Sequence, residues 1–400
     1  MYEPMTKSKS YTCPSCRNEG MKIFYKANNV PTISCLMFSN EEEAVSLPKD
    51  DVVLGFCDKC GFISNVVFDP SKLDYSSLAP EEQGFSGTFN AYAQKLASRL
   101  IENYNLKGKN ISEIGCGRGD FLALLCQLGN NHGVGIDPST VSGGVESEAS
   151  SRLTFIRDFY SARYAKYLGD FVACRHTLEH IHETADFIDS LRNGIEGKPD
   201  TVVFFEVPDV TRILHEVAFW DIYYEHCSYF NLGSLARLFR HSDFEVTNLM
   251  KDYFDQYLLI EAKPDGKKSE KLFENEESIE QTAKNVEDFS KHSEEKLDFW
   301  KKQLLQIHDK KKKTIVWGSG SKCVGFMTTL GVKDEIQYIV DINPRRHGKF
   351  IPGVGKQIVG PEFLKQYRPD TVIVMNPIYT NEIKKMMADM DLTAEFIPCS

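Results

Sequence analysis

The chain has 400 residues, 42% of them hydrophobic and 26% charged, a composition typical of a globular protein with two or three domains. Its net charge of −10 argues against a general nucleic-acid binder, because binding to phosphates requires a basic surface. We find no secretory signal and no apolar run long enough to span a bilayer, so we expect a cytoplasmic protein without a membrane partner.

The cysteines of residues 1–70 indicate a metal site. Eleven cysteines in a chain expected to be cytoplasmic favour free thiols and metal ligation over a disulfide framework. Four of them form two Cys-x2-Cys pairs: Cys13, Cys16, Cys57 and Cys60. Two such turns complete the tetrahedral thiolate shell that suits zinc, and four protein ligands leave no open position. We therefore predict a zinc-binding module with a structural metal, and interpret Cys35, between the pairs, as a spare cysteine.

Residues 71–263 alternate strand-like and helical segments, which predicts an α/β fold with a doubly wound, largely parallel sheet. A helix is expected over residues 86–105. The strand-like segments that follow are ISEIG, HGVGID, LTFIRD, YLGDFVACRH, TVVFFEVPD, FEVTNLM and YLLIEAK. The last two lie close together in the sequence and predict an antiparallel hairpin that closes the sheet.

The segment EIGCGRGDF, residues 113–121, follows the first of these strands and opens a helix. Its glycines, Gly115, Gly117 and Gly119, are a weak signal alone, because many nucleotide sites use such a turn. A pyrophosphate requires a helix N-terminus without a nearby carboxylate, and Glu113 stands just before these glycines. A carboxylate in that place favours a ligand with a cationic amino-acid end, such as S-adenosylmethionine. A nicotinamide or phosphate site on a similar fold is the alternative.

Two later strand ends offer further contacts for an adenosyl ligand. Asp137, in GIDPS, ends the second strand, and a carboxylate there can accept both hydroxyls of a ribose. Asp158 and Phe159 end the third strand and offer an acceptor for an amine and a ring edge for an adenine.

The C-terminal part divides into a charged segment and a second α/β unit. Residues 264–313 are dense in charges of both signs and predict a helical connector, with a disordered tether as the alternative. In residues 314–400, Gly318-x-Gly320 follows a strand and Asp341 ends the next one, which formally meets a dinucleotide fingerprint. The third close glycine is absent, so we predict a Rossmann-like domain that helps to bind the substrate. An oxidoreductase that uses this turn is the alternative.

Titratable side chains gather in two segments that should reach the carboxyl edge of the sheet, where open α/β sheets bind ligands. WDIYYEHCSYF holds Tyr223, Glu225 and His226, and a histidine beside a carboxylate and phenols suits proton abstraction near neutral pH. An aromatic packing loop with an incidental histidine is the alternative. RHTLEH holds His176 and His180, which we expect one helical turn apart on the same face, where either could donate to a developing oxyanion.

The segments EIGCGRGDFL, GIDPS and RHTLEHI together resemble those of the class I S-adenosylmethionine-dependent methyltransferases. The full-length layout, with a four-cysteine module, a central domain, a charged helix and a C-terminal unit bearing DINPRRHGKFIPG, resembles the sugar C-methyltransferases. Those enzymes act on nucleotide-linked 4-keto deoxyhexoses: a base removes the proton beside the ketone, and the enolate attacks the sulfonium methyl group. The resemblance implies a class I methyltransferase sheet, S-adenosylmethionine as the cofactor and a nucleotide-linked sugar as the acceptor.

The resemblance also implies roles for single residues. The tyrosine-x-glutamate-histidine motif of the family falls on Tyr223, Glu225 and His226, with His226 as the general base. The other active-site histidine of the family falls at His180, and a tyrosine that precedes the first helix falls at Tyr75. Together with the strand ends described above, the expected cofactor contacts are Glu113, Gly115, Cys116, Gly117, Gly119, Asp137, Asp158, Phe159 and His176.

The chain departs from the family pattern near its C-terminus. MNPIYTNEI, residues 375–383, stands where the sugar enzymes usually carry proline-tryptophan-asparagine before a glutamate-isoleucine pair. An O- or N-methyltransferase acting on a sugar or another small molecule would use the same donor site. A zinc-containing adaptor that binds a partner without catalysis is the alternative from another functional class.

Overall fold

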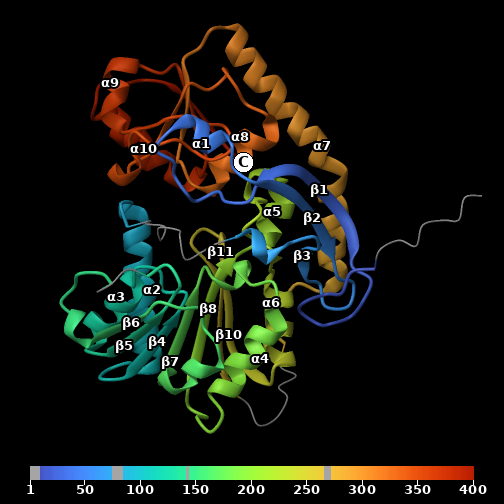
Figure 1. The fold of residues 1–400 in the computed structure, drawn as a ribbon, viewed down its shortest axis with the longest axis vertical. Coiled ribbons are helices and arrows are strands. Elements are labelled where there is room, and N and C mark those ends of the chain that lie inside the picture. Colours follow the sequence, from blue (N-terminus) through green and yellow to red (C-terminus); the bar gives the residue numbers. More distant parts are fainter. Residues whose placement is uncertain (1–9, 74–83, 141–143, 265–271) are drawn as a thin grey trace, which may run out of the picture.

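The computed structural model describes residues 10–73, 84–140, 144–264 and 272–400, and Tyr75 lies outside these ranges. Within them the strands form three sheets. In Figure 1 the central sheet and its helices occupy the lower part and the C-terminal unit lies above them. The N-terminal strands β1 and β2 and the long helix α7 run along one side and reach both parts (Figure 1).

The central sheet has seven strands among the described residues, in the order β10-β11-β8-β7-β4-β5-β6. They are β4 (Asn110–Ile114), β5 (His132–Ile136), β6 (Leu153–Ile156), β7 (Phe171–Arg175), β8 (Val202–Pro208), β10 (Phe244–Asp252) and β11 (Tyr257–Pro264). Strands β4 to β8 pair in parallel, and β10 and β11 form an antiparallel hairpin that pairs antiparallel with β8. β7 and β8 are buried along almost their whole length, as parallel strands covered on both faces require. The predicted α/β fold with its closing hairpin is confirmed.

Helices pack against the sheets. The α-helices are α1 (Glu41–Val45), α2 (Gly87–Tyr104), α3 (Asp120–Gly129), α4 (Thr184–Gly194), α5 (Val210–Glu216), α6 (Leu232–His241), α7 (Ile279–Asp309), α8 (Ser321–Leu330), α9 (Leu364–Tyr367) and α10 (Thr380–Ala388). Five of those described, α1, α2, α5, α6 and α7, begin at a residue whose side chain caps the helix. α2 follows the predicted 86–105 closely, because Ser86 accepts a hydrogen bond from the Phe89 N–H and Asn105 adopts the left-handed conformation that ends a helix. Among the described helices, none has the length and apolar character needed to cross a membrane.

The N-terminal sheet includes a strand from far along the chain. Its order is β1-β2-β3-β9, with β1 (Lys22–Pro31), β2 (Lys49–Phe56), β3 (Ile63–Asn65) and β9 (Ser228–Tyr229). Ile63 pairs with Tyr229, and the Asn65 N–H donates to the Cys227 carbonyl at 2.9 Å. The segment that carries the candidate base is therefore the edge of the cysteine-bearing module as well as a loop of the central domain.

The C-terminal unit is a parallel sheet in the order β14-β13-β12-β15-β16. Its strands are β12 (Thr314–Trp317), β13 (Tyr338–Val340), β14 (Ile358–Val359), β15 (Thr371–Val374) and β16 (Glu395–Pro398). Helix α7 occupies most of the charged segment and buries one stripe that includes Phe289 and Trp300. Phe289 packs against Tyr25 of β1 and Trp300 packs against Phe326 of α8, so α7 joins the N-terminal sheet to the C-terminal unit.

Candidate active site

A cavity of about 1400 Å³ opens at the carboxyl ends of the strands of the central and C-terminal sheets. Parallel strands end at the same edge of a sheet, which is where loops of this fold converge on a ligand. Of the predicted site residues, the lining includes Glu113, Gly115, Cys116, Gly117, Asp137, Phe159, His176, His180, Tyr223, Glu225 and His226. Gly119 and Asp158 lie outside the lining, and Tyr75 lies outside the described residues.

The first glycine turn, Gly115 to Gly119, joins β4 to α3. All three of its glycines have positive φ angles, +70°, +53° and +88°, where side chains are strained. A Cβ on Gly115 would lie 1.9 Å from Thr177 Oγ1, and a Cβ on Gly119 would lie 2.3 Å from a ring carbon of Phe155. Glycine is thus required by conformation and by packing. Helix α3 begins after Gly119 without a side-chain cap from that residue.

Two carboxylates flank this turn. Glu113 is 3% exposed, and its Oε2 has no hydrogen-bond partner among the described residues. Burial raises the pKa of Glu113 to about 8, against the opposing pull of the nearby Arg175. Asp137 Oδ2 accepts the Gly117 N–H at 2.9 Å, and its Oδ1 accepts the Ser139 N–H at 2.7 Å. Asp137 therefore holds the turn in shape while lining the cavity.

The structure separates Asp158 from Phe159. The ring of Phe159 is 56% exposed and lines the cavity. The Asp158 carboxylate instead accepts a hydrogen bond from the Tyr164 hydroxyl at 2.5 Å and pairs with Arg163. Its pKa is lowered, first by the Tyr164 hydrogen bond. Cys116 in the turn is buried, and burial raises the pKa of its thiol, so its contribution is packing beside Gly117.

A buried charge network lies at the ends of β7 and β8. Arg175 Nε and Nη2 donate to the two carboxylate oxygens of Glu206 at 2.8 and 3.1 Å, and the Arg175 guanidinium lies 4.0 Å from the Phe121 ring centroid. His176 Nε2 lies 2.8 Å from Glu206 Oε1, and His176 Nδ1 lies 3.7 Å from Glu179 Oε1. Burial would lower the pKa of His176, but the two carboxylates raise it to about 9. Both ring nitrogens of this cationic histidine thus face carboxylates.

His176 and His180 are not one helical turn apart on a shared face, as the sequence had indicated. His176 has a φ of +48°, outside the helical region, and the short 3-10 helix begins only at Leu178. The ring of His176 therefore packs edge-on against Tyr257, with centroids 4.5 Å apart. The ring of His180 packs edge-on against His226, with centroids 4.8 Å apart.

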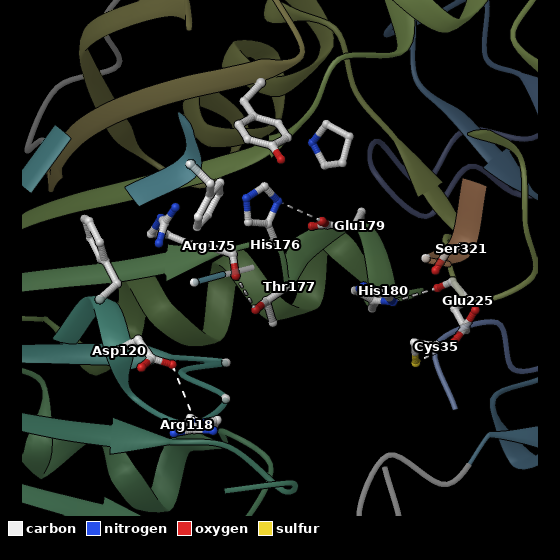
Figure 2. A pocket seen from close by; sticks show the side chains of 18 of the residues that line it. Cys35, Arg118, Asp120, Arg175, His176, Thr177, Glu179, His180, Glu225 and Ser321 are labelled. Atoms are coloured by element: carbon white, nitrogen blue, oxygen red, sulfur yellow. Dashed lines mark hydrogen bonds and ion pairs between the residues drawn. The ribbon is translucent and has the colours of Figure 1, made fainter. Parts of the chain in front are cut away.

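The loop between η6 (Phe219–Asp221) and β9 brings the candidate base to the cavity. Tyr223 Oη lies 3.1 Å from His226 Nε2. A carboxylate oxygen of Glu179 and one ring nitrogen each of His180 and His226 lie within 4.8 Å of one another. Burial, followed by the nearby His180 and His176, lowers the pKa of His226 well below its usual value. Figure 2 shows His180 and Glu225 at one end of the pocket and Arg118 and Asp120 at the other, with Thr177 between them.

Glu225 has partners that the sequence did not reveal. Its carboxylate accepts hydrogen bonds from the Ser34 N–H at 2.9 Å, from the Ser34 hydroxyl and from the Cys35 thiol at 3.1 Å. Burial raises the pKa of Glu225, and these donors oppose the shift. No local pattern marks Ser34, and Cys35 had been interpreted as a spare cysteine. Only its place between the two cysteine pairs could have directed attention to it.

The second glycine turn faces the same cavity from the C-terminal unit. Gly318 has a φ of +104°, and the Ser319 N–H donates to Asp341 Oδ2 at 3.0 Å. Arg346 Nη1 donates to the Ser319 hydroxyl at 3.0 Å and lies 3.6 Å from Asp341. Helix α8 has no side-chain cap at Gly320. The Ser319 hydroxyl itself donates to Asp341 Oδ2, so this turn presents helix N–H groups and a guanidinium to the cavity.

Two family models match successive parts of the chain. One, described as a methyltransferase domain, covers residues 87–249, and the other, described as a C-methyltransferase C-terminal domain, covers residues 258–398. The chain is an S-adenosylmethionine-dependent methyltransferase. It is 25% identical over 358 residues to the C-methyltransferase NovU of Streptomyces niveus, across 83% of this chain and 81% of that protein. The match to an enzyme family rules against the adaptor alternative.

Parts of solved methyltransferase structures are also similar to this methyltransferase. The 1,6-didemethyltoxoflavin-N1-methyltransferase of Burkholderia thailandensis is 17% identical, with a TM-score of 0.32, over 43% of this chain and 78% of that chain. The magnesium protoporphyrin IX methyltransferase of Synechocystis PCC 6803 is 18% identical, with a TM-score of 0.34, over 44% of this chain and 84% of that chain.

The thiol groups of the four paired cysteines form one cluster. Cys13 Sγ lies 3.6 Å from Cys60 Sγ, and Cys16 Sγ lies 3.6 Å from Cys57 Sγ. A tetrahedral zinc site with Zn–S bonds of about 2.3 Å places its sulfurs about 3.8 Å apart, so the donor set fits zinc. In each pair the residue after the second cysteine, Arg17 or Gly61, is left-handed and donates its N–H to the carbonyl of the first cysteine.

Proposed function

We propose that this methyltransferase transfers a methyl group to the carbon beside the ketone of a nucleotide-linked keto-deoxysugar. The observation that carries the proposal is a neutral, buried histidine, His226, in a cavity lined by both glycine turns. Carbon is a poor nucleophile until it becomes an enolate, so C-methylation requires a base close to the donor site. The match of residues 258–398 to a C-methyltransferase domain supports carbon as the methylated atom.

At the donor end we assign the residues of the first turn to the cofactor. When bound, S-adenosylmethionine supplies a methyl group already activated by its positive sulfur. The buried Glu113, with one unpartnered oxygen, would hold the cationic amino-acid end, and Asp137 would receive the ribose hydroxyls. Phe159 offers an exposed ring for the adenine, whereas the Asp158 carboxylate is engaged by Tyr164 and Arg163.

At the centre we assign His226 as the base that takes the proton from the acceptor carbon. Its lowered pKa keeps the ring unprotonated near neutral pH, and the Tyr223 hydroxyl on Nε2 orients the ring. The charge network of Arg175, His176 and Glu206 lies beside the donor turn and keeps Glu206 ionised, its pKa held at about 2 by Arg175 and His176 against the effect of burial. We assign this network to shaping the site, since both nitrogens of His176 face carboxylates.

At the acceptor end we assign the second glycine turn to the nucleotide part of the acceptor. The α8 N-terminus and Arg346 form a set of donors that suits a diphosphate. Asn376, within the segment that departs from the family pattern, makes a reciprocal amide pair with Gln256 of the central domain at 2.9 and 3.0 Å. The departure therefore falls at a contact between the domains beside the cavity.

The test uses candidate dTDP-, GDP- and CDP-linked 4-keto sugars with labelled donor in deuterated water. The wild-type enzyme should exchange deuterium into the carbon beside the ketone and methylate it, because both steps pass through the enolate. H226N should lose at least about 10²-fold in both rates, the usual contribution of a general base, while binding of S-adenosylhomocysteine stays unchanged. Methylation without exchange would instead support the O- or N-methyltransferase alternative.

We also propose that the four-cysteine cluster holds a structural zinc ion. Its sulfur spacing and its two matching turns support this, and a shell of four protein ligands leaves no position for a substrate. Metal analysis of the purified protein should find one zinc ion per chain that is lost in C13S.

A further inference from the structure

The dipeptide Ser34–Cys35 connects the N-terminal module to Glu225 of the active site. Glu225 is 2% exposed, and each of its carboxylate oxygens accepts a hydrogen bond from the segment Ser34–Cys35. Oε2 accepts the Ser34 N–H at 2.9 Å and the Ser34 hydroxyl, and Oε1 accepts the Cys35 thiol at 3.1 Å. A carboxylate held in this way serves as an anchor for its loop. Figure 2 shows Glu225 beside both Cys35 and His180.

Glu225 is connected directly to both candidate catalytic histidines, His180 and His226. The Glu225 carbonyl lies 3.0 Å from His180 Nδ1, and a carbonyl can only accept, so Nδ1 carries the proton. The Nε2 of a neutral His180 ring is then an acceptor, in a ring that meets His226 edge-on. The next residue along the chain is His226 itself. A shift of Glu225 would therefore move the base and would release the bond that sets the His180 tautomer.

The dipeptide is well placed for this role because its segment is held at both ends. The Thr32 N–H donates to the Pro48 carbonyl at 3.0 Å within the N-terminal module. Phe38 exchanges two backbone hydrogen bonds with Phe350 of the C-terminal unit, at 3.1 and 2.9 Å. The Ser34–Cys35 segment thus spans from the cysteine-bearing module to the C-terminal unit and passes the cavity on the way.

We propose that Ser34 and Cys35 are positioning residues for the methyl transfer, which act through the Glu225 carboxylate on His226 and on the His180 tautomer. This inference rests on the proposed function. It assigns the N-terminal module a part in the chemistry in addition to its structural metal. It also assigns Glu225 the role of an anchor, since both of its oxygens are occupied by the module.

The experiment compares S34A, C35A, C35S and the double variant S34A/C35A with the wild-type enzyme. The matched control is S64A, because Ser64 is also buried in the N-terminal sheet and lies outside the cavity lining. Among the described residues, its hydroxyl donates to Met21 Sδ and to no residue of the active site. For each variant we would measure kcat, both KM values, the rate of deuterium exchange into the acceptor, the affinity for S-adenosylhomocysteine, the Tm and the zinc content.

The double variant should lose about 10- to 100-fold in kcat and in the exchange rate, the size expected when a catalytic group is misplaced by about 1 Å. Its affinity for S-adenosylhomocysteine and its zinc content should match the wild type, and S64A should keep its kcat. C35S retains a donor and should recover most of the activity that C35A loses. Equal kcat in the double variant and the wild type, or a loss shared by S64A, would overturn the inference.

A readout without turnover separates this inference from the proposed function. In protein with ¹⁵N-labelled histidines, the His180 signals, assigned with H180N, should show a proton on Nδ1 in the wild type and in S64A. They should shift toward a mixture of tautomers in S34A/C35A. An unchanged His180 pattern would reject the positioning role even in an active enzyme. A wild type that neither methylates nor exchanges any keto sugar would reject the proposed function, while the His180 shift would still support the anchor.

Discussion

The two glycine turns of this methyltransferase share a backbone frame and differ in the charges around it. Gly115 and Gly318 each donate an N–H to the end of the neighbouring strand, to Ile136 and Val340, at 2.8 Å. In the first turn Asp137 accepts an N–H from the glycine turn at 2.9 Å and from the residue two positions after itself at 2.7 Å. In the second, Asp341 accepts the equivalent bonds at 3.0 and 2.8 Å.

The difference lies in the residue two positions before the first glycine. It is Glu113 in the first turn and Val316 in the second, and both are buried. The first turn thus offers a buried carboxyl group that can ionise, where the second offers an apolar strand end with Arg346 beside its serine. One frame can therefore serve a cationic donor and an anionic acceptor, because the strand end and the neighbouring loop set the charge.

Gly119 and Gly320, the last residues before α3 and α8, give the sharpest test of this comparison. G119A combines a positive φ of +88° with a Cβ 2.3 Å from Phe155, two effects that cost about 1–3 kcal/mol each. We expect its affinity for S-adenosylhomocysteine to fall about 100-fold, as measured by calorimetry. G320A has open space and a φ of −74°, so donor binding should be unchanged. Wild-type affinity in G119A would contradict the assignment of the first turn.

The charge of Glu113 predicts a pH dependence of donor binding. With a pKa of about 8, the Glu113 carboxyl group is mostly protonated at pH 7 in the enzyme without a ligand. A cationic ligand requires the ionised form of this group. The affinity for S-adenosylhomocysteine should therefore rise with pH toward 8, by up to about tenfold per pH unit below the pKa, with release of a proton to the buffer. Calorimetry in two buffers measures that proton. E113Q should bind weakly and without this slope, and a slope that survives in E113Q would assign it to another group.

A change in the second turn should affect the acceptor and leave donor binding unchanged. R346A removes the guanidinium that bonds to Ser319, so the KM for the nucleotide-linked acceptor should rise about fivefold, a modest change because this cation is also paired with Asp341. The affinity for S-adenosylhomocysteine should remain that of the wild type. Steady-state kinetics with each substrate varied in turn measures both. A change confined to the donor would reverse the assignment of the two turns.

Much of the site follows local patterns that could be read in the sequence. The glycines, Glu113 and Asp137 follow directly after strands, and the paired cysteines lie on short turns, so their spacing predicts their geometry. Tyr223 and His226, three residues apart, also lie in contact, with Tyr223 Oη 3.1 Å from His226 Nε2. The expected helical relation of His176 to His180 is wrong because a positive φ at His176 turns the chain before the 3-10 helix begins.

Other features depend on contacts between distant residues. Ser34 and Cys35 reach Glu225 across some 190 positions, and no pattern in either segment indicates the pairing. Arg175 finds Glu206 only because β7 and β8 are neighbours in the sheet. Asp158 follows its strand as predicted, but Tyr164 and Arg163 occupy its carboxylate.

The amino-acid sequence by itself determined the α/β alternation, the carboxyl group at the first glycine turn and the two Cys-x2-Cys turns, because each arises from residues a few positions apart. The tertiary structure alone decided that both glycine turns face one cavity, and that the cysteine-bearing module holds the loop of the candidate base. The physical reason is that burial and hydrogen bonding between remote segments assign the partners of a polar group, and those partners set its charge and its orientation.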